Sequence, residues 1–294
     1  MLYIPLIGIK MKKPKHLKKK SKRIRKKVKQ LYSSSLSSVQ WRNIRHLFPS
    51  YQGVGRPPKW HLKSILDAIF YVLRTGCAWR FIPNDFPPWR TVYDYFRKWT
   101  KSEFIKAIHD TLRNRIRREL GRNKSPSIGI IDKTTEQGGE RGYDAGKKIK
   151  GRKRHIIVDC LGFLLAVHVH PADIQDRDGA KPTLDKLEAL YPLLTIILAD
   201  GGYRGKLIQW VEDELGLKLE IIKRNDDVKG FEILPWRWIV ERTLAWINRN
   251  RRMSKDFERL PETTESWIYL FMFSLMSKRL EHIEKSKNYV ENVA

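Results

Sequence analysis

The hydrophobic pattern of the chain changes at Ser127, and this change constrains the fold more than any other feature of the sequence. Before it, apolar residues recur at helical spacing, as Leu62, Ile65 and Ile69 do. After it, short apolar runs such as 128–131 are separated by glycine-rich turns and by further helical stretches. The sequence therefore predicts a helical region followed by a region that mixes strands and helices.

Two helices are predicted in the first region. One carries the apolar series that begins at Leu62 and should stop at Gly76, and the other should begin near Trp89, after two prolines. The second helix places Val92, Phe96 and Trp99 on one face, while its cations Arg90, Arg97 and Lys98 lie elsewhere. Buried aromatics with exposed cations suit a helix-turn-helix-like DNA-binding domain. The alternative is a small helical bundle that uses the aromatics only for its core.

The second region is predicted to be α/β. Ranges 154–159 and 163–170 are rich in β-formers around Cys160-Leu161-Gly162, which indicates an antiparallel hairpin. The remaining expected elements are a strand at 128–131, helices at 179–190, 204–215 and 236–248, and strands at 194–199 and 218–222. This order of elements is that of an RNase H-like mixed sheet with flanking helices. The predicted domains are a flexible basic arm at 1–35, an all-α domain at 36–122, the RNase H-like domain at 123–280 and a C-terminal tail at 281–294.

The charge of the chain predicts a polyanionic partner. The formal net charge is +27, no acid precedes Asp67, and range 10–29 holds 13 Lys or Arg in 20 positions. Each cation that neutralises a phosphate releases counterions, so nucleic acid is the first expectation and an anionic membrane the second. The basic arm is interpreted as a clamp on phosphates. The alternative is a solvated tail, or an extension upstream of a true start at Met11.

Cysteine content and the first residues exclude other classes of protein. Cys77 and Cys160 form no CxxC pair, which argues against a disulfide framework or a zinc finger and favours a reducing compartment. The apolar stretch 1–9 is too short to span a membrane, and its charges follow it, unlike those of a secretory signal. We expect a soluble protein of the cytoplasm, associated with the nucleoid, with no membrane partner.

Three acids are the candidates for chemistry. Asp132 and Asp200 each follow an apolar run at a predicted strand end, and Glu241 is the only acid of its predicted helix, with Arg237 one turn earlier. Carboxylates from separated segments suit two Mg²⁺ ions in phosphodiester cleavage. Each acid also has an ordinary explanation, as a turn former, a strand-end cap or a salt-bridge partner. Spacing alone leaves five rivals to Asp132, namely Asp144, Asp159, Asp173, Asp176 and Asp178, the last of which resembles a helix cap.

A run of cations precedes the predicted hairpin and is interpreted as a surface for the DNA backbone. A solvated, charged loop is the alternative. The run consists of Lys147, Lys148, Lys150, Arg152, Lys153 and Arg154. Arg237 and Lys255 are further candidates for DNA contact.

Four motifs together resemble the transposases of the insertion-sequence-five type: Gly-Ile-Ile-Asp132, Glu140 to His155, Ala199-Asp-Gly-Gly-Tyr-Arg-Gly205 and Arg237-x3-Glu241. The similarity runs from about Leu36 to about Arg279. It includes the segments Gly55-Arg-Pro-Pro, Tyr71 to Arg80 and Ser254 to Thr263.

The resemblance implies a DNA-transposing enzyme of the DDE superfamily, whose Asp-Asp-Glu triad binds Mg²⁺ or Mn²⁺. The triad falls on Asp132, Asp200 and Glu241. The implied partners are double-stranded DNA, both the terminal inverted repeats of the element and the target, and a second copy of the chain on that DNA.

The sequence departs from this family in two places. Family members continue the first aspartate with Ser-Gln-Ser-Val before Lys-Thr-Thr, whereas Asp132 runs directly into Lys133-Thr134-Thr135. Of the pattern Tyr-x2-Arg-x3-Glu-x6-Lys, only Arg237 and Glu241 are present, and Arg249, Arg251 or Lys255 could supply the last cation. Two rival functions therefore stay open: a copy that binds DNA without cutting it, and an RNase H-like nuclease without joining activity.

Overall fold

The computed structural model describes residues 32–50, 57–139, 142–187, 190–222 and 236–293. The expected basic arm up to residue 31 and the Gly55-Arg56 pair lie outside them. The helical region comprises α1 (Ser38–Ile44), α2 (Leu62–Thr75), α3 (Trp89–Lys101) and α4 (Phe104–Glu119). The rest of the chain forms β1 (Ile128–Gln137), β2 (Tyr143–Asp144), β3 (Ile149–Val158), β4 (Leu164–Pro171), α5 (Asp176–Asp185), β5 (Ile196–Ala199), α6 (Lys206–Leu215), β6 (Lys218–Ile221), α7 (Arg237–Asn248) and α8 (Pro261–Val293).

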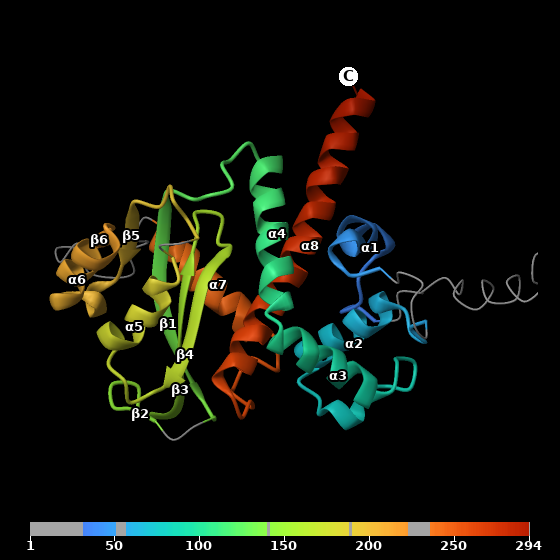
Figure 1. The fold of residues 1–294 in the computed structure, drawn as a ribbon, viewed down its shortest axis with the longest axis horizontal. Helices are drawn as coiled ribbons and strands as arrows, with labels where there is room; N and C mark the ends of the chain where they lie inside the picture. Colours follow the sequence, from blue (N-terminus) through green and yellow to red (C-terminus); the bar gives the residue numbers. More distant parts are fainter. Residues whose placement is uncertain (1–31, 51–56, 140–141, 188–189, 223–235, 294) are drawn as a thin grey trace, which may run out of the picture.

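The two helices predicted in the first region are confirmed. α2 ends where Gly76 adopts φ +70°, a left-handed conformation that glycine adopts without strain. α3 begins at Trp89 and buries Val92, Phe96 and Trp99, as its spacing predicts. The helical region and the sheet lie side by side in Figure 1, with α8 between them.

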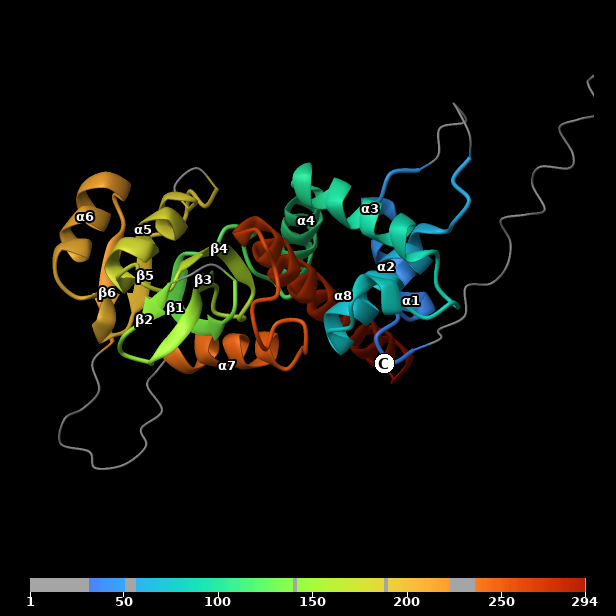
Figure 2. The same ribbon diagram turned by 90° about the horizontal axis from the view of Figure 1, so that it is seen from below.

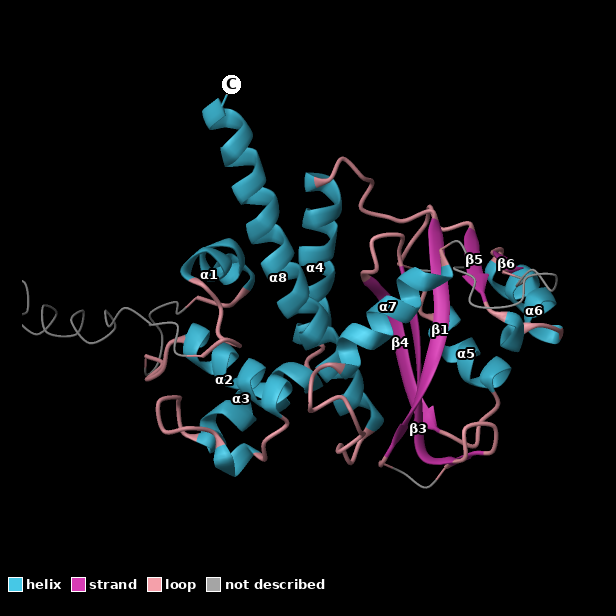
Figure 3. Ribbon diagram, turned by 180° about the vertical axis from the view of Figure 1, so that it is seen from behind, coloured by secondary structure: helices cyan, strands magenta, loops and turns pink. Residues whose placement is uncertain are grey.

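The sheet is mixed, with strand order β2-β3-β1-β5-β6 and β4 paired to β3. β3 and β4 form the predicted antiparallel hairpin, and β1 is antiparallel to β3. β1 and β5, and β5 and β6, are parallel pairs. Figure 3 shows the long strands β1, β3 and β4 crossing the centre of this part of the molecule. The architecture is the mixed sheet with flanking helices expected of an RNase H-like fold.

Alternate residues of the strands face two separate hydrophobic cores, because successive side chains of a strand point to opposite faces. Ile131, Ile157 and Ile197 join the core beneath α5 and α6. Their neighbours Ile130 and Ile156 join the other core, which α7, α8 and the helical region complete. Figure 2 shows α7 on the face of the sheet opposite α5.

α8 links the two regions of the molecule. It packs against α1, α2, α3 and α4 on one side and against β4 on the other. Trp267 of α8 stacks on Phe96 of α3 with ring centroids 4.5 Å apart. Asn43 of α1 donates a 2.7 Å hydrogen bond to Glu284. The helix therefore continues without a break across the expected boundary at residue 280, and residues 281–293 extend it.

Three local predictions differ from the structure. β1 does not end at Ile131 but continues to Gln137, because residues 130–137 stay paired with β3. The helix expected at 179–190 begins at Asp176, so Asp178 lies in its first turn and Gln175 occupies the cap position. The helix expected at 236–248 begins one residue later, at Arg237, and Trp236, which precedes its first turn, is 44% exposed.

In the part of the chain that the structure describes, no helix combines the length and the apolar character needed to cross a membrane.

Candidate active site

Asp132 and Asp200 lie on adjacent parallel strands. Ile130 of β1 pairs with Leu198 of β5, and each aspartate comes two residues after its strand's member of that pair. Asp200 follows the end of β5, as predicted, whereas Asp132 lies within β1, which continues beyond it. The parallel register therefore carries both carboxylates to the same level of the sheet, although only one of them ends a strand.

Glu241 comes from α7, which packs across β1 and β3. Val240 and Leu244 bury the inner face of this helix, and the Glu241 side chain is 49% exposed. Arg237, one turn earlier, lies between two of the candidate acids. Its Nη2 is 3.5 Å from Asp200 Oδ2 and its Nε is 3.0 Å from Glu241 Oε1. A cation of the chain itself thus joins the end of β5 to α7.

Asp132 is the most deeply buried of the three acids, with 8% of its surface exposed. Its pKa is raised to about 6, mainly by burial and in addition by the negative charges of Asp200 and Glu241. The backbone N–H of Lys133, 2.7 Å from Oδ1, and the positive charge of Arg237 act in the opposite direction. The pKa of Asp132 thus responds to both other acids, so the fold brings the three predicted residues into one electrostatic environment.

Asp200 also forms a local turn. Its Oδ1 accepts a 2.8 Å hydrogen bond from the N–H of Gly202 and caps the short 3₁₀ helix Gly201–Tyr203. Its other oxygen, Oδ2, faces Arg237. Asp200 therefore forms the turn considered from the sequence with one carboxylate oxygen and faces the candidate site with the other.

The three carboxylates are not arranged as a closed set of metal ligands in this structure. Across the described ranges, no three His, Cys, Asp or Glu side chains converge closely enough to hold an ion. The donor chemistry is suitable, because carboxylate oxygens are the ligands that Mg²⁺ and Mn²⁺ prefer. The position between Asp200 and Glu241 is taken by the Arg237 guanidinium, which forms ion pairs with both. The residues fit a divalent metal provided that Arg237 moves aside.

The rival aspartates have other partners. Asp159 is buried and pairs with Arg117, and Asp144 accepts a 2.6 Å hydrogen bond from Thr135. Asp176 pairs with Lys133 and Lys153. Asp173 and Asp178 are exposed.

The Lys133–Asp176–Lys153 network beside Asp132 escaped sequence reasoning. The two lysines belong to different strands and the acid to α5, so only the tertiary fold brings them together. The same holds for His155, whose Nδ1 lies 3.0 Å from the hydroxyl of Tyr203 just after Asp200.

The cationic run divides into an exposed part and a buried part. Lys147, Lys148 and Lys150 are exposed around the β2–β3 turn. Lys153 is buried and donates to the carbonyl of Ile174 at 2.7 Å.

Arg152 and Arg154 are also buried, at 0% and 1% exposure. Arg152 donates to the carbonyls of Glu258 and Arg259 at 2.9 and 2.8 Å, and Arg154 donates to that of Met253 at 2.7 Å. These two arginines hold the segment 253–259 against the sheet. In this structure they, like Lys153, offer no free charge to DNA, which corrects the reading of the run as one continuous DNA surface.

The other expected DNA-contacting cations are accessible. Arg90, Arg97 and Lys98 are exposed on α3, and Lys255 is exposed on the segment before α8. The Arg90 guanidinium lies 5.4 Å from the ring centroid of Trp89, and that of Arg97 lies 5.9 Å from the ring of Tyr93. These stacking contacts hold both arginines at the surface of α3.

Residues 123–276 match the family described as "Transposase DDE domain". The chain belongs to this family. Residues 36–109 match a second family, described as "Putative transposase of IS4/5 family". The insertion-sequence transposase resemblance and the RNase H-like architecture inferred from the sequence are thereby confirmed.

A relative of this DDE chain is the "Putative transposase for insertion sequence element IS402" of Burkholderia cepacia, which is 31% identical over 127 residues. The match covers 41% of this chain and 60% of the relative. The two proteins are thus compared over less than two thirds of that relative's length.

Proposed function

We propose that this chain is a DNA transposase that binds the ends of an insertion element and catalyses DNA strand cleavage and strand transfer. Asp132, Asp200 and Glu241 are its catalytic triad. The observation that carries the proposal is that acids from β1, the end of β5 and α7 share one electrostatic environment, in which the charges of Asp200 and Glu241 raise the pKa of Asp132.

The triad would hold Mg²⁺ or Mn²⁺ through its carboxylate oxygens. When bound, the metal supplies activation of an attacking hydroxyl and neutralisation of charge on the phosphate. With a pKa of about 6, Asp132 is mostly ionised at pH 7–8 and can act as an anionic ligand. Arg237 balances the charge of Asp200 and Glu241 and fixes α7 relative to β5.

Double-stranded DNA is the proposed partner. Lys147, Lys148 and Lys150 form an exposed cationic turn next to the short strand β2, where the DNA backbone would lie. Recognition of the element ends would fall to the helical region, with Arg90, Arg97 and Lys98 of α3 at the surface. We propose that two copies act together on paired ends.

Purified protein tests the proposal when it is incubated with Mg²⁺ and DNA that carries the sequences flanking its gene. The wild type should nick the ends and join them to a target. Asp200→Asn and Glu241→Gln should lower nicking at least about 10³-fold, as expected when charge stabilisation in a transition state is lost, and should still bind DNA. Asp213→Asn, an exposed acid on α6, is the matched control and should keep full activity.

The products separate the alternatives. Cut ends without joined strands would indicate a nuclease. Binding without cutting would indicate the non-enzymatic copy, which the direct run from Asp132 into Lys133 favours. Full nicking by Asp200→Asn would remove that residue from the triad.

A further inference from the structure

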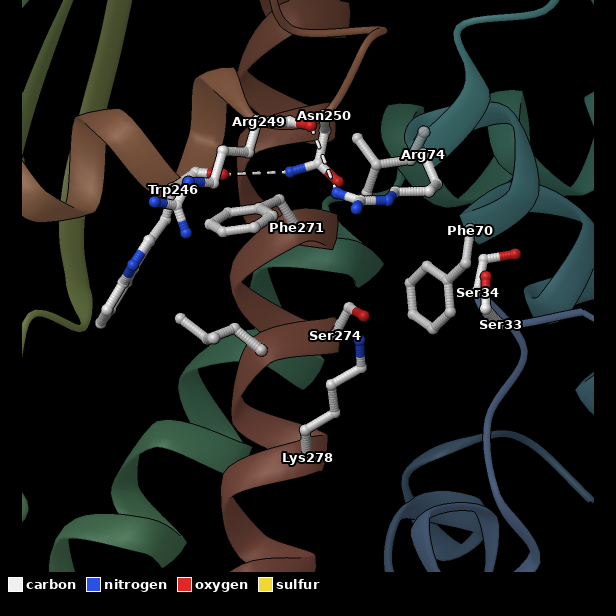
Figure 4. Close-up of a pocket in the computed structure, with 12 residues that line it drawn as sticks. Ser33, Ser34, Phe70, Arg74, Trp246, Arg249, Asn250, Phe271, Ser274 and Lys278 are labelled. Carbon is white, nitrogen blue, oxygen red and sulfur yellow. Dashed lines mark hydrogen bonds between the residues drawn. The ribbon is translucent and has the colours of Figure 1, made fainter.

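A second cationic site lies away from the candidate acids, in a cleft between α2, the end of α7 and α8. The cleft has a volume of about 420 Å³. Its lining includes several apolar side chains. It also includes three cations and three serines, namely Arg74, Arg249, Lys278, Ser33, Ser34 and Ser274. No Asp or Glu is among the described residues that line it. Figure 4 shows these side chains around the cleft, with Lys278 pointing along α8 toward Ser274.

No acid of the described residues neutralises the positive charge of this cleft. Arg74, Arg249 and Lys278 are exposed, and no carboxylate of the described residues lies within ion-pair distance of them. The charge continues along α7, where the Arg242 guanidinium lies 4.5 Å from the ring of Trp238 and 4.6 Å from that of Trp246, which lines the cleft. The nearby positive charge of Arg279 lowers the pKa of Arg242 further than burial alone does.

One of the three cations, Arg74, is held in place by the fold. Arg74 Nη1 donates a 3.2 Å hydrogen bond to the carbonyl of Arg249, which ties α2 to the end of α7. The backbone N–H of Arg252 bonds to Leu73 at the same junction. Ser34 Oγ is buried and has no hydrogen-bond partner among the described residues, so a donor and acceptor is left for a ligand.

We propose that this cleft binds a phosphodiester of the duplex DNA on which the candidate active site acts. The inference rests on the proposed function, because the anion is taken to be a DNA phosphate on the ground that the cleft lies close to Glu241 along α7. Arg249 lies eight residues after Glu241 on α7 and its cap, which is about 12 Å along the helix axis. B-form DNA advances about 3.4 Å per base pair, so a duplex that runs along α7 would place the cleft about four base pairs from the phosphate at the triad.

The test is the binding of a fluorescent 30-base-pair duplex, read by anisotropy as a function of salt, by the full chain. Arg249→Gln/Lys278→Gln removes two cations whose side chains form no ion pair or hydrogen bond with any described residue. Lys206→Gln/Lys218→Gln removes two exposed cations of α6 and β6, at the opposite end of the molecule from α8. Thermal unfolding of both variants establishes that they are folded.

The cleft variant should lower the slope of log affinity against log salt by about 0.9 and weaken binding about eightfold at 0.1 M salt, since one phosphate contact contributes about 0.9 to the slope. The control variant should stay within about threefold of the wild type. Equal weakening by both variants, or no weakening by the cleft variant, overturns the inference. A wild type that binds duplex but does not cut it contradicts the proposed cleavage alone and leaves the result on the cleft intact.

Discussion

Arg237 Nη2 lies 3.5 Å from Asp200 Oδ2, so a residue of α7 neutralises a carboxylate at the end of β5. The same guanidinium approaches Glu241, one turn along its own helix. A cation of the chain thus lies between two of the proposed metal ligands, and a divalent ion bound there would have to compete with it.

Replacing Arg237 by Gln should favour metal binding. Without the arginine, Mg²⁺ no longer competes with a fixed positive charge a few ångströms away, so its affinity should rise at least about tenfold. The increase in melting temperature on titration with Mg²⁺ measures this, because a ligand of the folded state stabilises it. Arg204→Gln, an exposed cation just after Asp200, is the control and should bind Mg²⁺ like the wild type. Equal affinities for wild type and Arg237→Gln would show that the arginine does not compete.

The raised pKa of Asp132 predicts a pH-dependent stability. Its folded pKa of about 6 exceeds the ordinary 3.8, so the folded state keeps a proton that the unfolded chain loses between these values. The stability this gives is fully present below about pH 4 and is lost as pH rises through 6. Asp132→Asn should therefore be more stable than the wild type by up to about 3 kcal/mol at pH 8. Urea unfolding at pH 4.5 and pH 8 measures the difference, which should be small at the lower pH. The exposed Asp94→Asn should show no such dependence.

Arg152 is predicted to be a structural residue. Its guanidinium lies 3.4 Å from Asp256 Oδ1, and both side chains are fully buried. Arg152→Met would leave Asp256 with Arg154, 4.0 Å away, as its remaining cationic partner and would free the carbonyls of Glu258 and Arg259, so the free energy of unfolding should fall by about 3–5 kcal/mol. Chemical denaturation measures it. Lys150→Met, an exposed cation on the same strand, should change stability by less than about 0.5 kcal/mol, and similar losses for the two variants would contradict this role.

Gly151 should tolerate no side chain. A Cβ built there would lie 1.9 Å from the carbonyl oxygen of Glu136 on the paired strand. Gly151→Ala must therefore separate β1 from β3 and should destabilise the protein by about 3 kcal/mol or more. Gly121→Ala is the comparison, since no atom lies within 4 Å there and only its φ of +68° is unfavourable, at about 1 kcal/mol. Melting temperatures of the two variants would rank them, and the reverse order would refute the steric argument.

Trp267 is predicted to hold α8 against the helical region. It is fully buried and stacks on Phe96 and Trp79. Trp267→Ala should lower the free energy of unfolding by about 3–5 kcal/mol, because it removes a large ring from a packed core. Phe81→Ala is the control, as this ring is 77% exposed. Guanidinium unfolding followed by far-UV circular dichroism gives both values, and a loss under about 1 kcal/mol for Trp267→Ala would be inconsistent with its burial.

Much of the fold follows from local pattern. The apolar spacing from Leu62 and the stop at Gly76 predicted α2, and the β-rich runs around Gly162 predicted the β3–β4 hairpin. The length of β1 was missed because Lys133 and Thr134 carry no apolar signal, and pairing with β3 alone keeps them extended. The hydrophobic pattern of a sequence indicates which side chains are buried, whereas pairing of the backbone also keeps polar segments extended.

The candidate site was also predicted from the sequence only in part. The apolar runs before Asp132 and Asp200 predicted that each aspartate follows a strand, whereas the pairing of those two strands, which brings both to one level of the sheet, came only from the structure. The burial of Arg152 and Arg154 could not be read from a run of six cations, because it depends on carbonyls of residues 253–259, about a hundred positions later. Contacts between residues so far apart in the chain produce no periodic pattern in the sequence.

The position of α8 has a consequence for synthesis on the ribosome. The residues that cover Phe96, Val92 and their neighbours belong to α8, which begins only at Pro261. The helices α1 to α4 therefore emerge with an open apolar side that stays uncovered until α8 has been translated. A polypeptide that stops before Pro261 would leave this apolar side exposed to solvent.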